Sequence, residues 1–257
     1  MAETNLVDLR LSEGGRIATL TLQEPRLNVL STPVLDGLIQ AAVRLQAMED
    51  LRLVIVTGAG GRAFIGGADL QEMAEFTPER ALIFIDKIHK VCHLLRTLPV
   101  PSIARVQGFC LGAGMEVAAS CDLRIGSEDS RYGMPEVQVG LPSVVEARLL
   151  PTLIGWGRTR ELLYTGAVID AREAERIGFL ERVAPAEGLD AAIQPWLDAI
   201  LAAEPGAIRA QKRLIEGWLE TGIAAGVQHS IDVFSQSFHT DAPNRRLREA
   251  LQRLRGR

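Results

Sequence analysis

Short apolar runs alternate with segments of helical periodicity along the first 190 residues. Behind Ser31 and Pro33, which are typical of a helix start, apolar side chains recur at three- and four-residue spacing as far as Leu45. The run at residues 53–56 is apolar without alternation, which indicates a strand buried on both faces. The pattern predicts strands at residues 16–22, 53–56, 102–106 and 123–125, and helices at 31–45, 158–163 and 171–177. We therefore expect an α/β fold.

Strand signals end near residue 190, and the remainder has the periodicity of successive helices. We expect helices at 191–203, 206–219, 223–238 and 247–254, with an interruption at 241–243. The sequence thus predicts an α/β core at 1–190 and a helical region at 191–257. No low-complexity linker separates them, so we expect the helices to dock on another surface, such as a neighbouring subunit.

Two stretches of the core contain the same succession of a strand, a glycine-rich loop and a helix start. A strand at 53–58 leads through a glycine-rich loop into helical residues from Leu70. A strand at 102–106 leads through the glycine-rich loop 108–114 into a helix predicted to begin at Met115. The first turn of a helix leaves backbone N–H groups without partners, which suits an anion or a developing oxyanion. Side by side, the two units would aim two N–H donors at one point; alternatively, both loops only turn the chain.

Two glutamates follow the second glycine loop. Glu116 lies in the predicted first helical turn among apolar neighbours, and Glu136 lies in the next loop. Burial in apolar surroundings would raise the pKa of the Glu116 carboxyl toward the range useful for acid–base chemistry. The alternative is a first-turn glutamate that only complements the helix dipole.

Composition and charge narrow the function. The chain has 257 residues, 47% of them hydrophobic, so it can build a large core. Its net charge of −4 argues against a nucleic-acid-binding protein. No apolar run approaches the roughly 18 residues of a membrane span, and the first ten residues lack the features of a signal peptide. Three cysteines without a CxxC pair fit a reducing compartment, so we expect a cytoplasmic protein.

Other site motifs are absent or incomplete in the sequence. There is no P-loop and no G-x-S-x-G nucleophile elbow. Residues 58–63 match G-x-G-x-x-A, but Gly66 and Gly67 fall where a dinucleotide-binding fold needs its helix. His89 and His93 have the spacing of a metal-binding pair, but Lys90 replaces the glutamate of HExxH. We expect surface or partly buried histidines there, and no metal site.

Three motifs together resemble the enoyl-CoA hydratase/isomerase (crotonase) superfamily. They are Phe-Ile-Gly-Gly-Ala-Asp-Leu at 64–70, Gly-Phe-Cys-Leu-Gly-Ala-Gly-Met-Glu at 108–116 and Gly-Met-Pro-Glu at 133–136. Shorter matches at 153–155, 161–166, 171–174 and 178–180 extend the resemblance over residues 17–251. Either glycine loop alone would be a weak signal, but the two together are specific.

The resemblance implies a spiral of repeated ββα units followed by a helical trimerisation region. It implies assembly as a trimer or a dimer of trimers, and an acyl-CoA thioester as substrate. By position, the backbone N–H groups of Ala68 and Ala113 would form the oxyanion hole for the thioester oxygen. No metal or redox cofactor is implied, because coenzyme A is part of the substrate. The remaining substrate contacts implied by position are Arg26, Gly66, Asp69, Leu70, Gln71 and Gly112.

The glutamate pair indicates the branch of the family. Glu116 and Glu136 both match the pair of the hydratases, in which one carboxylate activates a water toward Cβ and the other delivers a proton to Cα. We therefore expect an enoyl-CoA hydratase. Two alternatives stay open: isomerisation or another lyase reaction of an acyl-CoA in the same oxyanion hole, and a degenerate, non-enzymatic subunit with a structural or RNA-associated role.

The sequence departs from the family pattern in three places. Ala113 stands where the family usually has glycine, which requires a negative φ there. Residues 140–146 replace a glycine-rich segment and introduce Glu146, a candidate third carboxylate for which we expect a surface or ion-paired position. Leu254 stands where a lysine often meets the CoA nucleotide, while Arg26 keeps the N-terminal basic position.

Overall fold

The structure, a computed structural model, describes residues 6–255. It divides into two compact units, Met1–Leu197 and Asp198–Arg257. This division falls close to the predicted boundary at residue 190, which stays a prediction. The argument against a signal peptide used the first ten residues. Five of these, residues 1–5, lie outside the described part.

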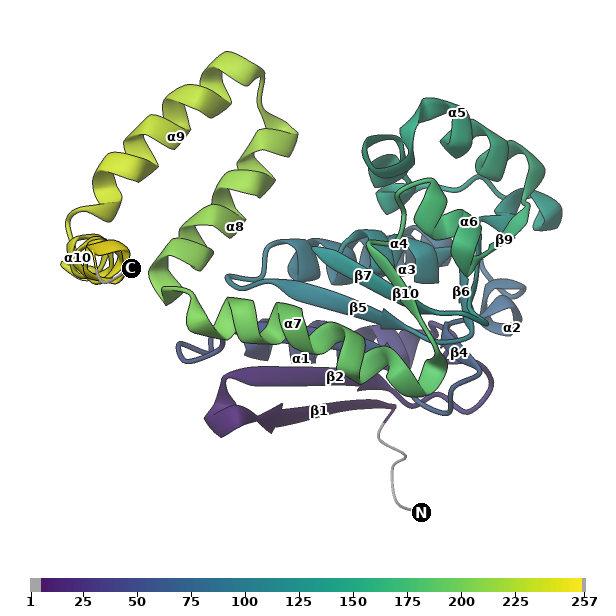
Figure 1. The fold of residues 1–257 in the computed structure, drawn as a ribbon. Coiled ribbons are helices and arrows are strands. Elements are labelled where there is room, and N and C mark those ends of the chain that lie inside the picture. The colour runs from purple at the N-terminus through teal and green to yellow at the C-terminus, as the bar shows by residue number, and fades with distance from the viewer. Residues whose placement is uncertain (1–5, 256–257) are drawn as a thin grey trace. The chain divides into compact units, whose positions relative to one another are not determined.

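A six-stranded sheet forms the centre of the first unit (Figure 1). Its β1–β2 pair is antiparallel and every other pairing is parallel. The inner strands are covered on both faces, which explains their apolar, non-alternating sequence. In spatial order the strands are β1 (Val7–Ser12), β2 (Ile17–Leu22), β3 (Leu53–Gly58), β5 (Ser102–Val106), β7 (Leu123–Ser127) and β10 (Arg182–Ala184). The four predicted strands are confirmed, and β1 and β10 had no prediction.

A smaller sheet is built from short strands inside the predicted loops. In spatial order they are β4 (Ala63–Ile65), β6 (Phe109–Leu111), β8 (Arg131–Gly133) and β9 (Val168–Asp170). The two glycine-rich stretches are therefore not only loops, because β4 and β6 pair in parallel within them. Each repeated unit contributes one long strand to the first sheet, one short strand to the second, and then a helix. This is the spiral of ββα units that the resemblance implies.

Helices cover the sheets of the first unit. The predicted helix at 31–45 is confirmed as α1 (Thr32–Gln46), with Ser31 at its N-cap and Val34, Leu35, Leu38 and Ala42 among its buried residues. It packs against α3 (Pro78–Arg96), which follows the single turn α2 (Leu70–Met73). The remaining helical elements of this unit are α4 (Ala113–Ala119), α5 (Leu150–Thr165), α6 (Ala171–Arg176) and the 3-10 turns η1 (Glu13–Gly15), η2 (Pro135–Val139), η3 (Val145–Leu149) and η4 (Ala186–Gly188).

Two predicted helix starts in the first unit were wrong. Helix α4 begins at Ala113, two residues before the predicted Met115, because Gly112 takes the N-cap position and the close-packed glycine at 114 is tolerated inside the first turn. Helix α5 begins at Leu150 rather than at residue 158, with a kink at Gly155, whose φ is +75°. The kink breaks the apolar periodicity that sequence patterns rely on. Gly166 ends α5 in a left-handed conformation.

Within the described residues, every regular element of the second unit is a helix. Helix α7 (Leu189–Ala202) runs across the division, and α8 (Pro205–Glu220), α9 (Ile223–Ser237) and α10 (Ala242–Arg255) follow. The predicted interruption at 241–243 was wrong in part, because α10 begins at Ala242 with Pro243 in its first turn, where a proline loses no hydrogen bond. Among the described residues, no helix combines the length and the apolar character needed to cross a membrane.

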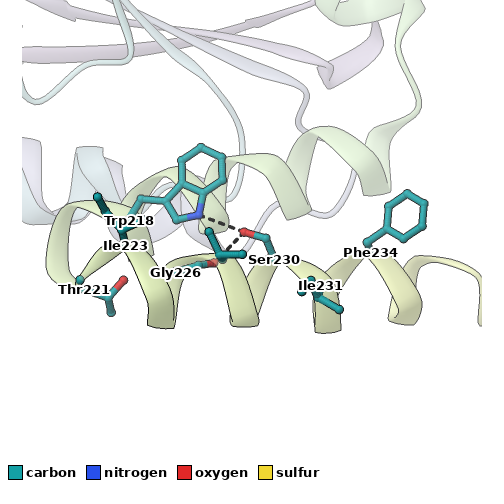
Figure 2. Close-up of a pocket in the computed structure, with 9 residues that line it drawn as sticks. Trp218, Thr221, Ile223, Gly226, Ser230, Ile231 and Phe234 are labelled. Carbon is teal, nitrogen blue, oxygen red and sulfur yellow. Dashed lines mark hydrogen bonds between the residues drawn. The ribbon is translucent and has the colours of Figure 1, made fainter.

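Helices α8 and α9 form an antiparallel pair with an apolar pocket between them (Figure 1, Figure 2). The indole Nε1 of Trp218 donates a hydrogen bond of 3.1 Å to Ser230 Oγ across the pair. Apolar side chains continue along α9 toward solvent: Ile223 is 88% exposed and Phe234 is 70% exposed. A two-helix pair cannot bury such a row by itself, so this face of the unit presents unpartnered apolar surface.

Candidate active site

A cavity of about 650 Å³ lies within the first unit. Its wall comes from residues 66–68, α2, α3, the start of α4 and the segment 135–144. Most of the wall is apolar, including Met73, Phe76, Phe84, Ile85, Ile88 and Leu111. Glu116 and Glu136 line the same cavity, as do Ala68 and Ala113. The structure therefore brings together the two predicted N–H donors and the two predicted carboxylates.

The N–H group of Ala68 is left out of the local backbone pairing. Residues 30 and 68 form a parallel bridge, but the bridge uses the carbonyl of Gly67 and the N–H of Asp69, at 2.8 and 2.9 Å from their Leu30 partners. Gly67 has φ +114°, a conformation that L side chains rarely adopt. The glycine at 67 thus sets the orientation of the Ala68 peptide beside the cavity.

Ala113 is the first residue of helix α4, so its N–H group lies at the helix N-terminus. Gly112 is the N-cap, and its carbonyl accepts from Met115 N and Glu116 N at 2.8 and 3.2 Å, whereas the first residue of a helix has no such acceptor behind it. Gly112 has φ +52°, and a side chain there would collide with the carboxylate of Glu136. Ala113 is not among the residues with positive φ, so alanine fits where the family usually has glycine. Helix geometry and dipole both favour negative charge at this point.

Glu116 projects from α4 into the cavity wall and is 4% exposed. Its Oε1 accepts a hydrogen bond of 3.1 Å from Ala147 N in η3. Burial raises the pKa of the Glu116 carboxyl to about 8, with the negative charge of Glu136 adding to the effect. Glu116 is therefore protonated at neutral pH in the free protein.

Glu136 has a different environment. It lies in the first turn of η2, is half-buried, and accepts a hydrogen bond of 2.8 Å from Ser143 Oγ to its Oε2. The turn ends at Gly140, which has φ +82° and returns the chain toward the cavity. A buried carboxyl with a raised pKa and a second, less buried carboxyl with its own donor thus share one cavity, an arrangement that suits acid and base catalysis.

The predicted substrate contacts divide into two groups. Gly66, Leu70 and Gly112 line the cavity. Asp69, Arg26 and Gln71 form a network beside it: Arg26 pairs with Asp69 at 2.6 Å and with Glu24 at 2.9 Å, and its Nη1 donates to Gln71 Oε1 at 2.8 Å.

This network has a local structural consequence. Asp69 also caps α2 by accepting from Gln71 N at 3.0 Å. Arg26 therefore ties the loop that precedes α1 to the start of α2, and Ala68 lies directly before this anchored residue. A contact between Arg26 and substrate stays a prediction, because its guanidinium already meets two carboxylates.

Three contacts at the site had no prediction from the sequence. Ser143 and the backbone of Ala147 bind the two carboxylates, and His89 binds Glu146 at 2.9 Å between Nδ1 and Oε1. Glu146 is buried and lies within ion-pair distance of His89, which is compatible with one of the two positions expected for it. In the sequence, the altered segment 140–146 pointed to Ser143 and its neighbourhood, and the His89/His93 spacing pointed to His89 for a different reason. Within residues 6–254, no cluster of three or more His, Cys, Asp or Glu side chains is arranged to hold a metal ion.

Comparison with known proteins decides the family. The model of the family described as "Enoyl-CoA hydratase/isomerase" matches residues 12–253. The chain belongs to the enoyl-CoA hydratase/isomerase family.

Similar members of the enoyl-CoA hydratase/isomerase family have named activities. The short-chain-enoyl-CoA hydratase of Clostridium acetobutylicum is 32% identical over 233 residues, which cover 90% of this chain and 89% of that protein. The crotonyl-CoA hydratase of Syntrophomonas wolfei is 32% identical over 242 residues, 93% of this chain and 92% of that one. The crystal structure of an enoyl-CoA hydratase from Bacillus anthracis superposes with a TM-score of 0.91 at 29% identity and covers 96% of each chain. The resemblance and the crotonase-like fold class are confirmed.

Proposed function

We propose that the protein is an enoyl-CoA hydratase that adds water reversibly across the 2,3 double bond of an enoyl-CoA thioester. One observation carries the proposal: two backbone N–H donors and two glutamate carboxyl groups, one of them with its pKa raised to about 8, line a single cavity. The hydratase names of the relatives from Clostridium acetobutylicum and Syntrophomonas wolfei support it.

The chemistry follows from where charge develops. When the oxygen of water bonds to Cβ, the electrons of the double bond move toward the thioester, whose oxygen becomes an enolate. The N–H groups of Ala68 and Ala113 would stabilise that oxygen, and one such donor is worth about 3–4 kcal/mol in comparable sites. The carboxylate of the pair takes a proton from the water while the carboxylic acid gives a proton to Cα. One proton enters and one leaves, so the pair keeps its total number of protons.

We propose that no metal or redox cofactor takes part. Hydration leaves the overall oxidation state unchanged, and the chain itself supplies both proton-transfer groups and the oxyanion donors. Coenzyme A belongs to the substrate. A cytoplasmic location is proposed as well, and the three cysteines support it because all are buried thiols.

We propose that the chain self-associates as a trimer or a dimer of trimers through its second unit. The exposed apolar row on α9, which includes Ile223, Val227, Ile231 and Phe234, supports this. Replacing Ile231 and Phe234 with Asp would place charges in a buried interface and should yield monomers by light scattering. Unchanged mass in the variant would contradict the proposal.

Incubation of crotonyl-CoA with the protein in ¹⁸O-water tests the reaction. Hydration gives 3-hydroxyacyl-CoA with one ¹⁸O at Cβ. Isomerisation or another lyase reaction gives a product without that label, and would replace the hydratase proposal. Absence of any turnover and of any CoA-ester binding would favour the non-enzymatic alternative.

A further inference from the structure

A third carboxylate lies buried behind Glu116, outside the cavity wall. Glu146 is 4% exposed, and its Oε1 lies 2.9 Å from Nδ1 of His89 on α3. Among the described residues, no hydrogen-bond donor reaches its Oε2. A buried carboxylate oxygen without a partner is costly, so its retention calls for a physical explanation.

The backbone connects Glu146 directly to Glu116. Ala147, the next residue in η3, donates its N–H to Glu116 Oε1 at 3.1 Å. The preceding residue, Val145, has φ +39°, which is disfavoured for a β-branched side chain. The segment therefore adopts a conformation against its local preference, and the bond from Glu146 to His89 attaches it to α3. This attachment places the Ala147 N–H on the Glu116 carboxyl.

We infer that the Glu146–His89 pair is a positioning element for Glu116: it anchors η3 so that the Ala147 N–H binds and orients the Glu116 carboxyl, while the charge of Glu146 opposes the loss of the Glu116 proton. The inference deepens the proposed function and rests on it, because hydration needs one protonated member of the pair. Glu146 acts through Glu116 and does not touch the substrate.

The charges around Glu116 agree with this assignment. Glu136 faces it from η2, Glu146 from η3 and Cys92 from α3, where His89 and His93 also lie with ring centroids 5.9 Å apart. Burial and then the charge of Glu146 raise the pKa of the Cys92 thiol well above its ordinary value, so Cys92 adds no charge. Glu116, which meets no cationic partner within the described part of the chain, is the group that stays neutral.

The test is a titration of the Glu116 carboxyl in the full-length protein. Infrared or ¹³C NMR signals of this carboxyl are identified by their loss in Glu116→Gln. In Glu146→Gln, which keeps the shape and a hydrogen bond to His89 but removes the charge, we expect the titration midpoint of Glu116 to fall by roughly one pH unit. His89→Ala should instead raise it, because η3 loses its anchor and the Glu116 carboxylate loses the stabilising hydrogen bond from Ala147 N–H.

A double variant and a matched control sharpen the test. Glu146→Gln/His89→Ala should titrate above Glu146→Gln alone, because the double variant loses the anchor of Ala147 as well as the charge. His93→Ala, one turn along α3, should leave the midpoint unchanged, since His93 stacks beside His89 without binding Glu146 in the described structure. An unchanged midpoint in Glu146→Gln, or an equal shift in His93→Ala, would overturn the inference. If Glu146→Gln fails to fold, His89→Ala decides the matter alone.

This titration also separates the two proposals. It needs no turnover, so a shifted midpoint in a protein that does not hydrate crotonyl-CoA would retain the positioning role and reject the hydratase. If the wild-type protein is active, the alkaline limb of its kcat/KM profile should move with the midpoint in each variant.

Discussion

Helix α4 and the turn η2 each bring a glutamate to the same cavity, but the two side chains have different surroundings. Glu116 extends from a helix whose residues Ala113–Ala119 are all buried, and a backbone N–H holds its carboxyl. Glu136 lies on a half-buried 3-10 turn, where a serine hydroxyl holds it. The difference shows that burial and neighbouring charge, not residue identity, decide which carboxyl carries the proton.

The two environments also differ in how closely their residues are packed. Around α4, Gly114 meets the carbonyl of Ile65 so closely that no side chain fits. Around η2, Val139, Leu141 and Val144 are each more than one-third exposed. We therefore expect chemistry to depend most on α4, and the segment after η2 to tolerate more change.

The largest effect is expected when the carboxyl group of Glu116 or of Glu136 is removed. Glu116→Gln and Glu136→Gln should each reduce kcat by about 10²- to 10⁴-fold, because proton transfer is lost while side-chain shape remains. Binding of a CoA ester, measured by calorimetry, should stay close to wild type. Near-normal turnover in both variants would show that these carboxylates do not perform the proposed steps.

The next largest effect concerns the oxyanion donor of α4. Ala113→Pro removes the N–H at the first helical position, which proline tolerates well, so the fold should persist. Loss of one donor should lower kcat by roughly 10²- to 10³-fold. Circular dichroism gives the folding control, and Ala113→Ser, which keeps the N–H, is the matched variant. Equal activity of the proline and serine variants would exclude Ala113 N–H as a donor.

The raised pKa of Glu116 gives two pH effects. Activity should fall as pH rises through about 8, where Glu116 loses its proton. The folded state binds this proton more tightly than the unfolded chain, so the protonated carboxyl stabilises the fold at low pH. This contribution to the free energy of unfolding is lost as the pH rises from the ordinary glutamate pKa toward about 8. Glu116→Gln should therefore lose less Tm between about pH 5 and about pH 8 than wild type. Parallel Tm profiles would contradict a buried, protonated Glu116.

The smallest expected effect concerns the hydrogen bond to Glu136 on η2. Ser143→Ala removes one hydrogen bond to Glu136, worth about 1 kcal/mol, and should lower kcat/KM roughly fivefold. Thr152→Ala is the matched control on α5, where the hydroxyl donates to the backbone carbonyl of Leu149, and it should leave kcat/KM unchanged. A loss as large as that of Glu136→Gln would mean that Ser143 does more than orient the carboxylate.

Local patterns along the chain determined much of this protein. The strands at 53–56 and 102–106 were predicted from apolar runs, and α1 was predicted from its cap and its periodicity. The family was indicated by two glycine loops and two glutamates. Each of these signals lies within a few neighbouring residues, so it can be read from the sequence. Tertiary structure decided the rest. The strands β4 and β6 exist only because two distant loops pair in parallel, and each is too short to leave a periodic signal. The proton on Glu116 depends on burial and on the charges of Glu136 and Glu146, which approach it only after folding, since burial and charge act through space rather than along the sequence.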